Sequence, residues 1–186
     1  MNKTVLIVIV AVVALLVIIS IGSYNGLVSG QEKVEEYAAN IDAQLQRRAD
    51  LIPNLVSTVQ SYTDHEEAVF TELANARAAL AGAKTMSEKA EADAQLNTAL
   101  GNLIAIAEAY PELKSSELYR GMMDELEGCE NRISYARTEY NNAVKDYNAK
   151  IRRFPSVIFA NMFGFDAADY FQATQGAAAV PSVSFK

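Results

Sequence analysis

The feature that most constrains this chain is an uncharged stretch of 28 residues, Thr4 to Gln31, whose first part, Val5 to Ile21, is almost entirely Val, Ile, Leu and Ala. A helix of about 17 to 19 residues rises roughly 26 to 29 Å, close to the thickness of the hydrocarbon core of a bilayer. The stretch therefore predicts a transmembrane helix over residues 4–22, preceded by an N-terminal tip of residues 1–3. We expect a single-pass protein of the cell membrane.

A cleaved secretory signal is the alternative interpretation, because Asn2 and Lys3 could form its short positive lead. We favour the anchor, since the apolar run exceeds the roughly 7–15 residues typical of a signal and no A-x-A-like cleavage site follows it. Orientation depends on few charges: Lys3 precedes the span, whereas Lys33 lies among three glutamates after it. The positive-inside rule then places the N-terminus in the cytoplasm and the bulk of the chain outside.

The remaining 155 residues, 32–186, are enough for one domain with a hydrophobic core. The formal net charge of −7 argues against nucleic acid as a partner, because phosphate backbones require a cationic surface. The single Cys129 can form neither an intramolecular disulfide nor a thiolate metal cluster within one chain. The Ala-, Gly- and Ser-containing tail, residues 173–186, is expected to be disordered.

Apolar residues recur at helical spacing through the rest of the chain, and no stretch shows the alternation of a strand. The most regular stripe has a strict 3,4 spacing, which continues to Ile151 and Phe154; its members are Tyr119, Met122, Leu126, Cys129, Ile133, Ala136, Tyr140, Ala143 and Tyr147. The fold class predicted is all-α: an N-terminal transmembrane helix followed by a long up-and-down four-helix bundle in residues 31–154.

Breaks between these helices have recognisable signals. Gly82 is expected to end a helix in the left-handed conformation, Thr85 with Glu88 forms a capping box, and Tyr110-Pro111 ends the third helix. Residues 62–65 are ambiguous, because Thr63 with Glu66 fits a capping box while the apolar stripe continues in phase. We favour four helices (31–62, 64–81, 86–109, 116–153) over one continuous helix through residues 31–81, since a lone hairpin would leave its stripe exposed.

An even number of long passes returns the chain to the membrane end, which brings Lys150, Arg152, Arg153 and the apolar segment 154–165 close to lipid. This segment contains Phe154 and Phe159, and from residue 155 onward it belongs to a C-terminal apolar segment predicted over residues 155–172. One interpretation is an interfacial membrane contact. The other, which we slightly favour, is that the cations cap the last helix and the apolar residues fill the base of the bundle.

Three glycines, Gly22, Gly26 and Gly30, follow the span at intervals of four, the last two within a juxtamembrane segment of residues 23–30. Small residues at this spacing let helices approach closely, so they are candidates for a contact between copies of the chain. A flexible hinge is an equal alternative. Tyr24 is well placed as an interfacial anchor in both cases.

Four motifs in this order closely resemble the LemA family of bacterial membrane proteins: IDAQLQRRADLIPNLVSTVQSYTDHE (41–66), EAYPELK (108–114), ENRISYARTEYNNAVKDYN (130–148), and FPS followed by FGF and YF (154–171). The resemblance covers nearly the whole chain after the anchor. It implies a four-helix bundle without an assigned enzymatic activity. Because such proteins are often encoded near membrane quality-control components, an HtpX-like metalloprotease is an implied partner.

Two of these motifs have simple physical interpretations. Arg47 and Arg48 are expected to form ion pairs on the helix surface near a bend at Pro53, or alternatively to bind an anion or lipid headgroup. Tyr140-Asn141 and Tyr147-Asn148, one heptad apart, are expected to satisfy buried polar groups and to set the register of the last helix.

Catalytic arrangements have little support. His65 is the only histidine, which excludes a di-iron site with two Glu-x-x-His pairs, and no phosphate-binding loop or nucleophile elbow occurs. We expect neither enzyme activity, nor a metal, nor a cofactor. The sequence predicts a membrane-anchored scaffold or adaptor of the cell envelope that binds itself or other membrane proteins. The alternative is a ligand-sensing ectodomain, which would need a polar cavity in the bundle.

Overall fold

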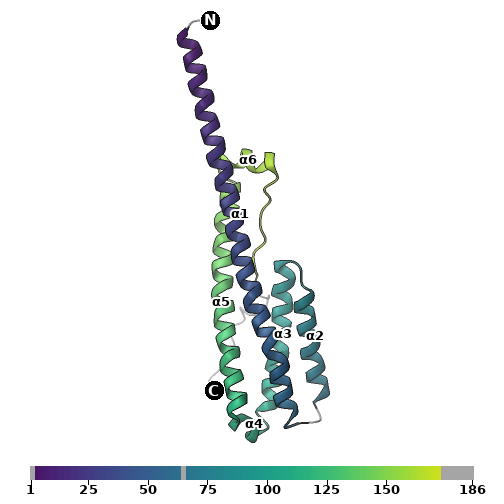
Figure 1. Cartoon of the computed structure of the whole chain (residues 1–186). Helices are drawn as coiled ribbons and strands as arrows, with labels where there is room; N and C mark the ends of the chain where they lie inside the picture. Colours follow the sequence, from purple (N-terminus) through teal and green to yellow (C-terminus); the bar gives the residue numbers. More distant parts are fainter. Residues whose placement is uncertain (1–2, 64–65, 173–186) are drawn as a thin grey trace, which may run out of the picture. The chain divides into compact units, whose positions relative to one another are not determined.

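A computed structural model describes residues 3–63 and 66–172, and every regular element in these ranges is a helix. The helices are α1 (Lys3–Gln60), α2 (Glu67–Gly82), α3 (Met86–Ala107), α4 (Pro111–Ser115), α5 (Glu117–Ile151) and α6 (Ser156–Phe163) (Figure 1). The predicted fold class is confirmed. His65 and the tail of residues 173–186 lie outside the described residues, so the expectations for them stay predictions.

The chain divides into two compact units, and both α1 and α5 contribute to each of them. We call Met1–Ala38 with Glu139–Asp169 the anchor unit, and Ala39–Thr138 with Tyr170–Lys186 the bundle unit. In the anchor unit, α1 contains a segment long and apolar enough to cross a membrane, and the rest of the chain buries none of this segment's most apolar window. The span is therefore left to contact lipid or another membrane protein.

The bundle unit is a four-helix bundle made of residues 39–60 of α1, helices α2 and α3, and residues 117–138 of α5. Helices α2 and α3 lie side by side (Figure 1). Because α1 ends at Gln60 and α2 begins at Glu67, residues 31–81 form two helices, as we favoured. The core consists of the expected apolar stripes: Ile41, Leu45, Ile52, Leu55 and Val59; Leu73, Ala76 and Leu80; Leu96, Leu100 and Leu103; and Met122, Leu126, Cys129 and Ile133.

The apolar stripe of α5 is buried at every predicted position from Tyr119 to Ile151. Phe154 was expected to continue this face, but the helix has ended at Ile151 and the Phe154 side chain is 81 % exposed. The expectation for Phe154 was wrong, because a residue beyond the helix end no longer follows the helical period.

The signals at the helix ends were only partly correct. Thr85 and Glu88 form the predicted capping box, and hydrogen bonds from the Thr85 and Lys84 backbones lower the pKa of the Glu88 carboxyl. Gly82 does not adopt the predicted left-handed conformation: α2 ends through Ala83 in an extended conformation. No side chain caps the start of α2 at Glu66.

Thr63, predicted to begin that cap, instead accepts a hydrogen bond from the Tyr110 hydroxyl at 3.1 Å. The only positive φ in the described residues, +73°, is at Gly164, directly after α6.

Pro53 lies inside α1, where its missing N–H leaves the carbonyl of Ala49 without its usual intrahelical donor. Arg77 of α2 supplies the replacement, since its Nε donates to the Ala49 oxygen at 3.0 Å. A hydrogen bond between α2 and α1 thus replaces the backbone hydrogen bond that Pro53 removes within α1.

This compensation predicts an energetic coupling between Arg77 and Pro53. Arg77→Met should lower the free energy of unfolding by about 1–3 kcal/mol, because it leaves the Ala49 carbonyl unsatisfied. In a Pro53→Ala background the loss should be smaller, because alanine supplies its own N–H. The measurement is urea unfolding followed by circular dichroism in detergent, as a double-mutant cycle. Arg132→Met is the matched control, and equal losses from Arg77→Met in both backgrounds would contradict the coupling.

Candidate functional site

The three glycines after the span have different surroundings in the anchor unit. A Cβ atom at Gly26 would lie 2.9 Å from the Lys150 Nζ, and one at Gly30 would lie 3.2 Å from the Tyr147 Cδ2. Both glycines therefore allow α5 to approach α1 within one chain, and α1 continues through them without a break. Gly22 has no heavy atom of the described chain within 4 Å of its Cβ position apart from its chain neighbours and the surrounding helix backbone. A contact between copies stays a prediction, and Gly22 is the glycine open to it.

Lys150 is engaged inside the chain, because its Nζ donates to the Gly26 carbonyl at 2.6 Å. Its ammonium thus ties the last turn of α5 to α1. Arg152 and Arg153, directly after α5, are exposed. The sequence suggested one role for all three cations. In the structure Lys150 connects two helices, whereas Arg152 and Arg153 are exposed.

The chain after α6 is fixed to α5 by the polar residues that the sequence analysis selected. The Asn148 side chain donates to the Ala168 carbonyl at 2.8 Å and accepts from the Ala168 N–H at 2.9 Å, while the Tyr140 hydroxyl donates to the Asp169 carbonyl at 2.7 Å. Burial, followed by the charge of Asp169, raises the pKa of the Tyr140 hydroxyl. The buried side chains of Tyr140 and Asn148 thus bind backbone groups of the chain after α6, and their expected effect on the register of the last helix stays a prediction.

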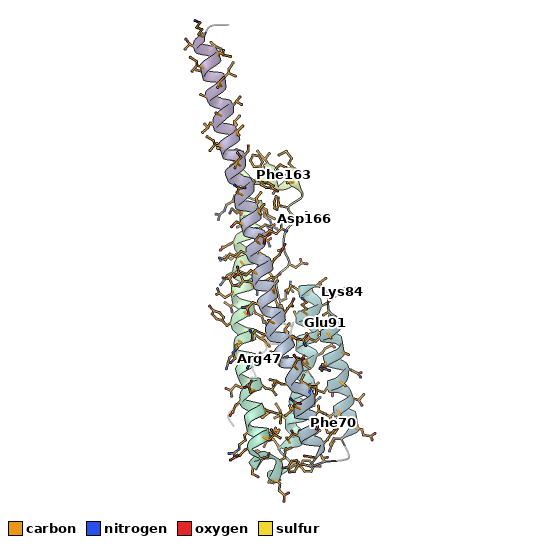
Figure 2. The ribbon with its side chains drawn as sticks, in the orientation of Figure 1. Arg47, Phe70, Lys84, Glu91, Phe163 and Asp166 are labelled. Carbon is orange, nitrogen blue, oxygen red and sulfur yellow. The ribbon has the colours of Figure 1, made fainter. Side chains whose placement is uncertain are left out.

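Helix α6 packs onto the exit of the span through aromatic rings. The Tyr24 ring meets Phe163 edge-on with centroids 5.0 Å apart, and Phe165 with centroids 5.8 Å apart (Phe163 is labelled in Figure 2). Edge-to-face pairs at these separations are favourable. The segment 154–165 therefore lies at the end of the span, as the even number of passes predicted.

The interpretation in which this segment fills the base of the bundle was wrong. Ala160 is buried and Phe159 is half-buried, but four other large apolar side chains are more than half exposed; these are Phe154, Ile158, Met162 and Phe163. An eight-residue helix can bury only one narrow side against a neighbour, so the rest of an apolar helix stays exposed. We call Arg152–Phe154 together with α6 the juxtamembrane patch.

In the bundle unit, Arg48 was expected on the helix surface, but it is 1 % exposed. Its guanidinium binds the Asp93 carboxylate at 2.6 Å, the Glu130 carboxylate at 2.6 Å and the Asn97 side-chain oxygen at 2.9 Å. Arg47 does remain on the surface, where it pairs with Glu125 at 3.1 Å (Arg47 is labelled in Figure 2). The two neighbouring arginines therefore have different roles.

Two carboxylates share the Arg48 guanidinium, and Asp93 is the buried one. Burial raises the pKa of the Asp93 carboxyl, and Glu130 raises it further, whereas Arg48 opposes both effects. Asp93 and Glu130 were not predicted from the sequence, although a signal existed. Arg48 lies in phase with Ile41, Leu45 and Ile52. Asp93 likewise precedes Leu96 and Leu100 at helical spacing, and a charge within an apolar stripe indicates a buried partner.

A groove of ≈ 320 Å³ lies between α1, α2 and α3 in the bundle unit, with Arg77 and Lys89 at its border. Both cations are bound within the chain: Arg77 to the Ala49 carbonyl, and Lys89 to the Asp42 carboxylate at 2.6 Å. Across residues 3–63 and 66–172, no three His, Cys, Asp or Glu side chains come together as metal ligands would.

Comparison with known proteins gives a consistent result. The model of the LemA family matches residues 37–185. Magnetosome protein MamQ 2 of Paramagnetospirillum magneticum and magnetosome protein MamQ of Magnetospirillum gryphiswaldense are each 28 % identical, over 80 % of this chain and 64 % of their own length. Protein LemA of Metamycoplasma hominis is 24 % identical, over 83 % of this chain and 71 % of its own. The chain thus spans less than two thirds of the MamQ proteins.

Substitutions at the two arginines should separate their roles. Arg48→Met is expected to lower the free energy of unfolding by about 3–5 kcal/mol at neutral pH, because it leaves the buried Asp93 charge uncompensated. Arg47→Met, the matched control, should have little effect, since its ion pair is exposed. The measurement is urea unfolding of the full chain in detergent.

The loss in free energy of unfolding caused by Arg48→Met should also become smaller as the pH falls. Because the pKa of Asp93 is raised, the folded chain binds a proton on this carboxyl more tightly than the unfolded chain does. The contribution of Asp93 to the free energy of unfolding therefore decreases as pH rises from 3.8 through the folded pKa. Without Arg48 the folded pKa rises further, and protonation at acid pH removes the uncompensated charge. A pH-independent difference between wild type and Arg48→Met would contradict this account.

Proposed function

Because the chain belongs to the LemA family and its N-terminal apolar span anchors it to a membrane, we propose that it is a non-enzymatic helical scaffold of the bacterial cell envelope. It would assemble copies of itself or other membrane proteins, an HtpX-like protease among them. The observation that carries this proposal is the uncovered span: none of its most apolar window is buried, and no atom of the described chain outside the surrounding helix lies within 4 Å of the Gly22 Cβ position.

The polar chemistry of the bundle unit supports the same proposal. Arg48 is bound by three side chains, and the cations beside the groove between α1, α2 and α3 are bound as well. A ligand-sensing role would require polar groups that bind a metabolite, and in this groove the Arg77 Nε and the Lys89 ammonium are already bound to groups of the chain. The scaffold role therefore has the better support.

Self-association through the span predicts a measurable change of mass. The wild-type chain in mild detergent should have a mass that is a multiple of one chain, and Gly22→Leu should shift it towards a single chain, because leucine prevents close approach of two helices. Light scattering with correction for detergent gives the mass. Gly121→Leu is the matched control, since Gly121 is also in a helix with nothing within 4 Å of its Cβ position.

A strictly single-chain wild type, or a mass that Gly22→Leu leaves unchanged, would contradict self-association. Gly26 and Gly30 are unsuitable for this test, because leucine there would collide with Lys150 and Tyr147 of the same chain.

We also propose that the N-terminus is cytoplasmic and the bundle unit lies outside, with Lys3 as its support. A Ser184→Cys substitution in a Cys129→Ala background should then react with a membrane-impermeant maleimide added to intact cells. Cys129 is completely buried, so its replacement removes only a slow background reaction. Labelling only after the cells are opened would contradict this orientation.

A further inference from the structure

We propose that the juxtamembrane patch, Arg152–Phe154 with α6, binds anionic lipids of the bilayer that α1 spans. This contact would be a second attachment to the membrane in addition to the span. It depends on the anchor but not on the scaffold role, because a monomer with this patch would bind lipid equally well.

The patch has the apolar surface that insertion at a bilayer interface requires. Helix α6 carries no charge, and Phe154, Ile158, Met162 and Phe163 are 81 %, 52 %, 62 % and 55 % exposed. Exposing so many large apolar side chains on one short segment is costly in water. The same residues are favourable at the boundary between headgroups and acyl chains.

The patch is also continuous with the lipid-facing surface of the span. A groove of ≈ 370 Å³ in the anchor unit is formed on one side by the last residues of the span and on the other by α6; it is lined by Ser20, Ile21, Tyr24, Asn25, Phe159, Met162 and Phe163. The Tyr24 ring holds the two sides together through Phe163 and Phe165. Lipid that surrounds Ile21 therefore reaches α6 as well, and Tyr24 lies at the level where tyrosine is enriched in membrane proteins.

Charge selects the class of lipid. Residues 147–165 contain Lys150, Arg152 and Arg153 but no Asp or Glu, in a chain whose net charge is −7. Lys150 is bound to the Gly26 carbonyl, so the two exposed arginines are the groups that face a headgroup. Guanidinium groups bind phosphate oxygens in a bidentate manner, and a lipid without a compensating cation, such as phosphatidylglycerol, gains most from them.

Tryptophan fluorescence tests whether α6 contacts lipid. The chain has no tryptophan, so Met162→Trp introduces a single reporter on α6, and Tyr135→Trp introduces a matched control at an exposed position of the bundle unit. Each full-length variant is reconstituted into vesicles of phosphatidylcholine and phosphatidylglycerol in equal amounts. With lipids brominated on their acyl chains, the Met162→Trp reporter should be blue-shifted and strongly quenched, whereas the Tyr135→Trp reporter should be quenched only by aqueous iodide.

A second arm tests the choice of lipid. Bromine is placed on only one of the two lipids, and the ratio of quenching gives the preference of the Met162→Trp reporter for phosphatidylglycerol. Arg152→Gln and Arg153→Gln should each reduce this preference by about fivefold, the effect of about 1 kcal/mol per arginine near an anionic surface. Lys84→Gln with Arg132→Gln removes two exposed charges from the bundle unit and should leave the preference unchanged.

Each other outcome would overturn the proposal. A Met162→Trp reporter that iodide quenches as strongly as the control would show that α6 lies in water. A reporter shielded from both quenchers, with shielding that weakens on dilution of protein in lipid, would show a second copy on the patch. Quenching without a preference for phosphatidylglycerol, or a preference that both arginine substitutions leave intact, would show that the contact does not select anionic lipid.

Discussion

The packing of the helices after the span depends on the apolar stripe of α5, because a helix of 35 residues with one continuous apolar face cannot remain exposed in water. The chain covers this face with different partners in its two units. In the bundle unit α1 and α3 lie beside it, since Arg48 of α1 bonds to Glu130 and residues of α3 and α5 line one groove. In the anchor unit α1 approaches it through Gly30, and the chain after α6 is bound to Tyr140 and Asn148. Burying each large apolar side chain contributes about 1.5–3 kcal/mol, so the stripe contributes to the stability of both units.

Much of this architecture could be predicted because it follows from local chemistry. The spacing of Leu45, Ile52 and Leu55 requires a helix with one buried face, and Thr85 with Glu88 requires a helix start, wherever the other helices lie. The left-handed cap could not be assigned in the same way. Gly82 and Gly164 both follow apolar helical segments, but only the path of the following chain decides which glycine needs a positive φ.

The candidate site was harder to predict, because its contacts join residues distant in the sequence. Glycines at intervals of four indicate that another helix can approach α1 closely, but they do not indicate which helix. At Gly26 the neighbour is Lys150 of the same chain. Arg47 and Arg48 have the same side chain, and their positions relative to the apolar stripe alone distinguish them. Since Arg48 is in phase with the stripe, the burial of its charge was predictable, whereas its partners Asp93 and Glu130 depend on the packing of α3 and α5.

The hydrogen bond from Arg77 to the Ala49 carbonyl has a consequence for how sequences of this family can change. Pro53 is tolerated within α1 as long as Arg77 of α2 donates to the carbonyl that the proline leaves without a backbone donor. If residue 53 is not proline, its own N–H donates to that carbonyl, and Arg77 has no equivalent acceptor. Pro53 and Arg77 should therefore be inherited and lost together among homologues, as a covarying pair that is 24 positions apart in the sequence. Such a pair would record the contact between α1 and α2 in alignments, independently of any structure.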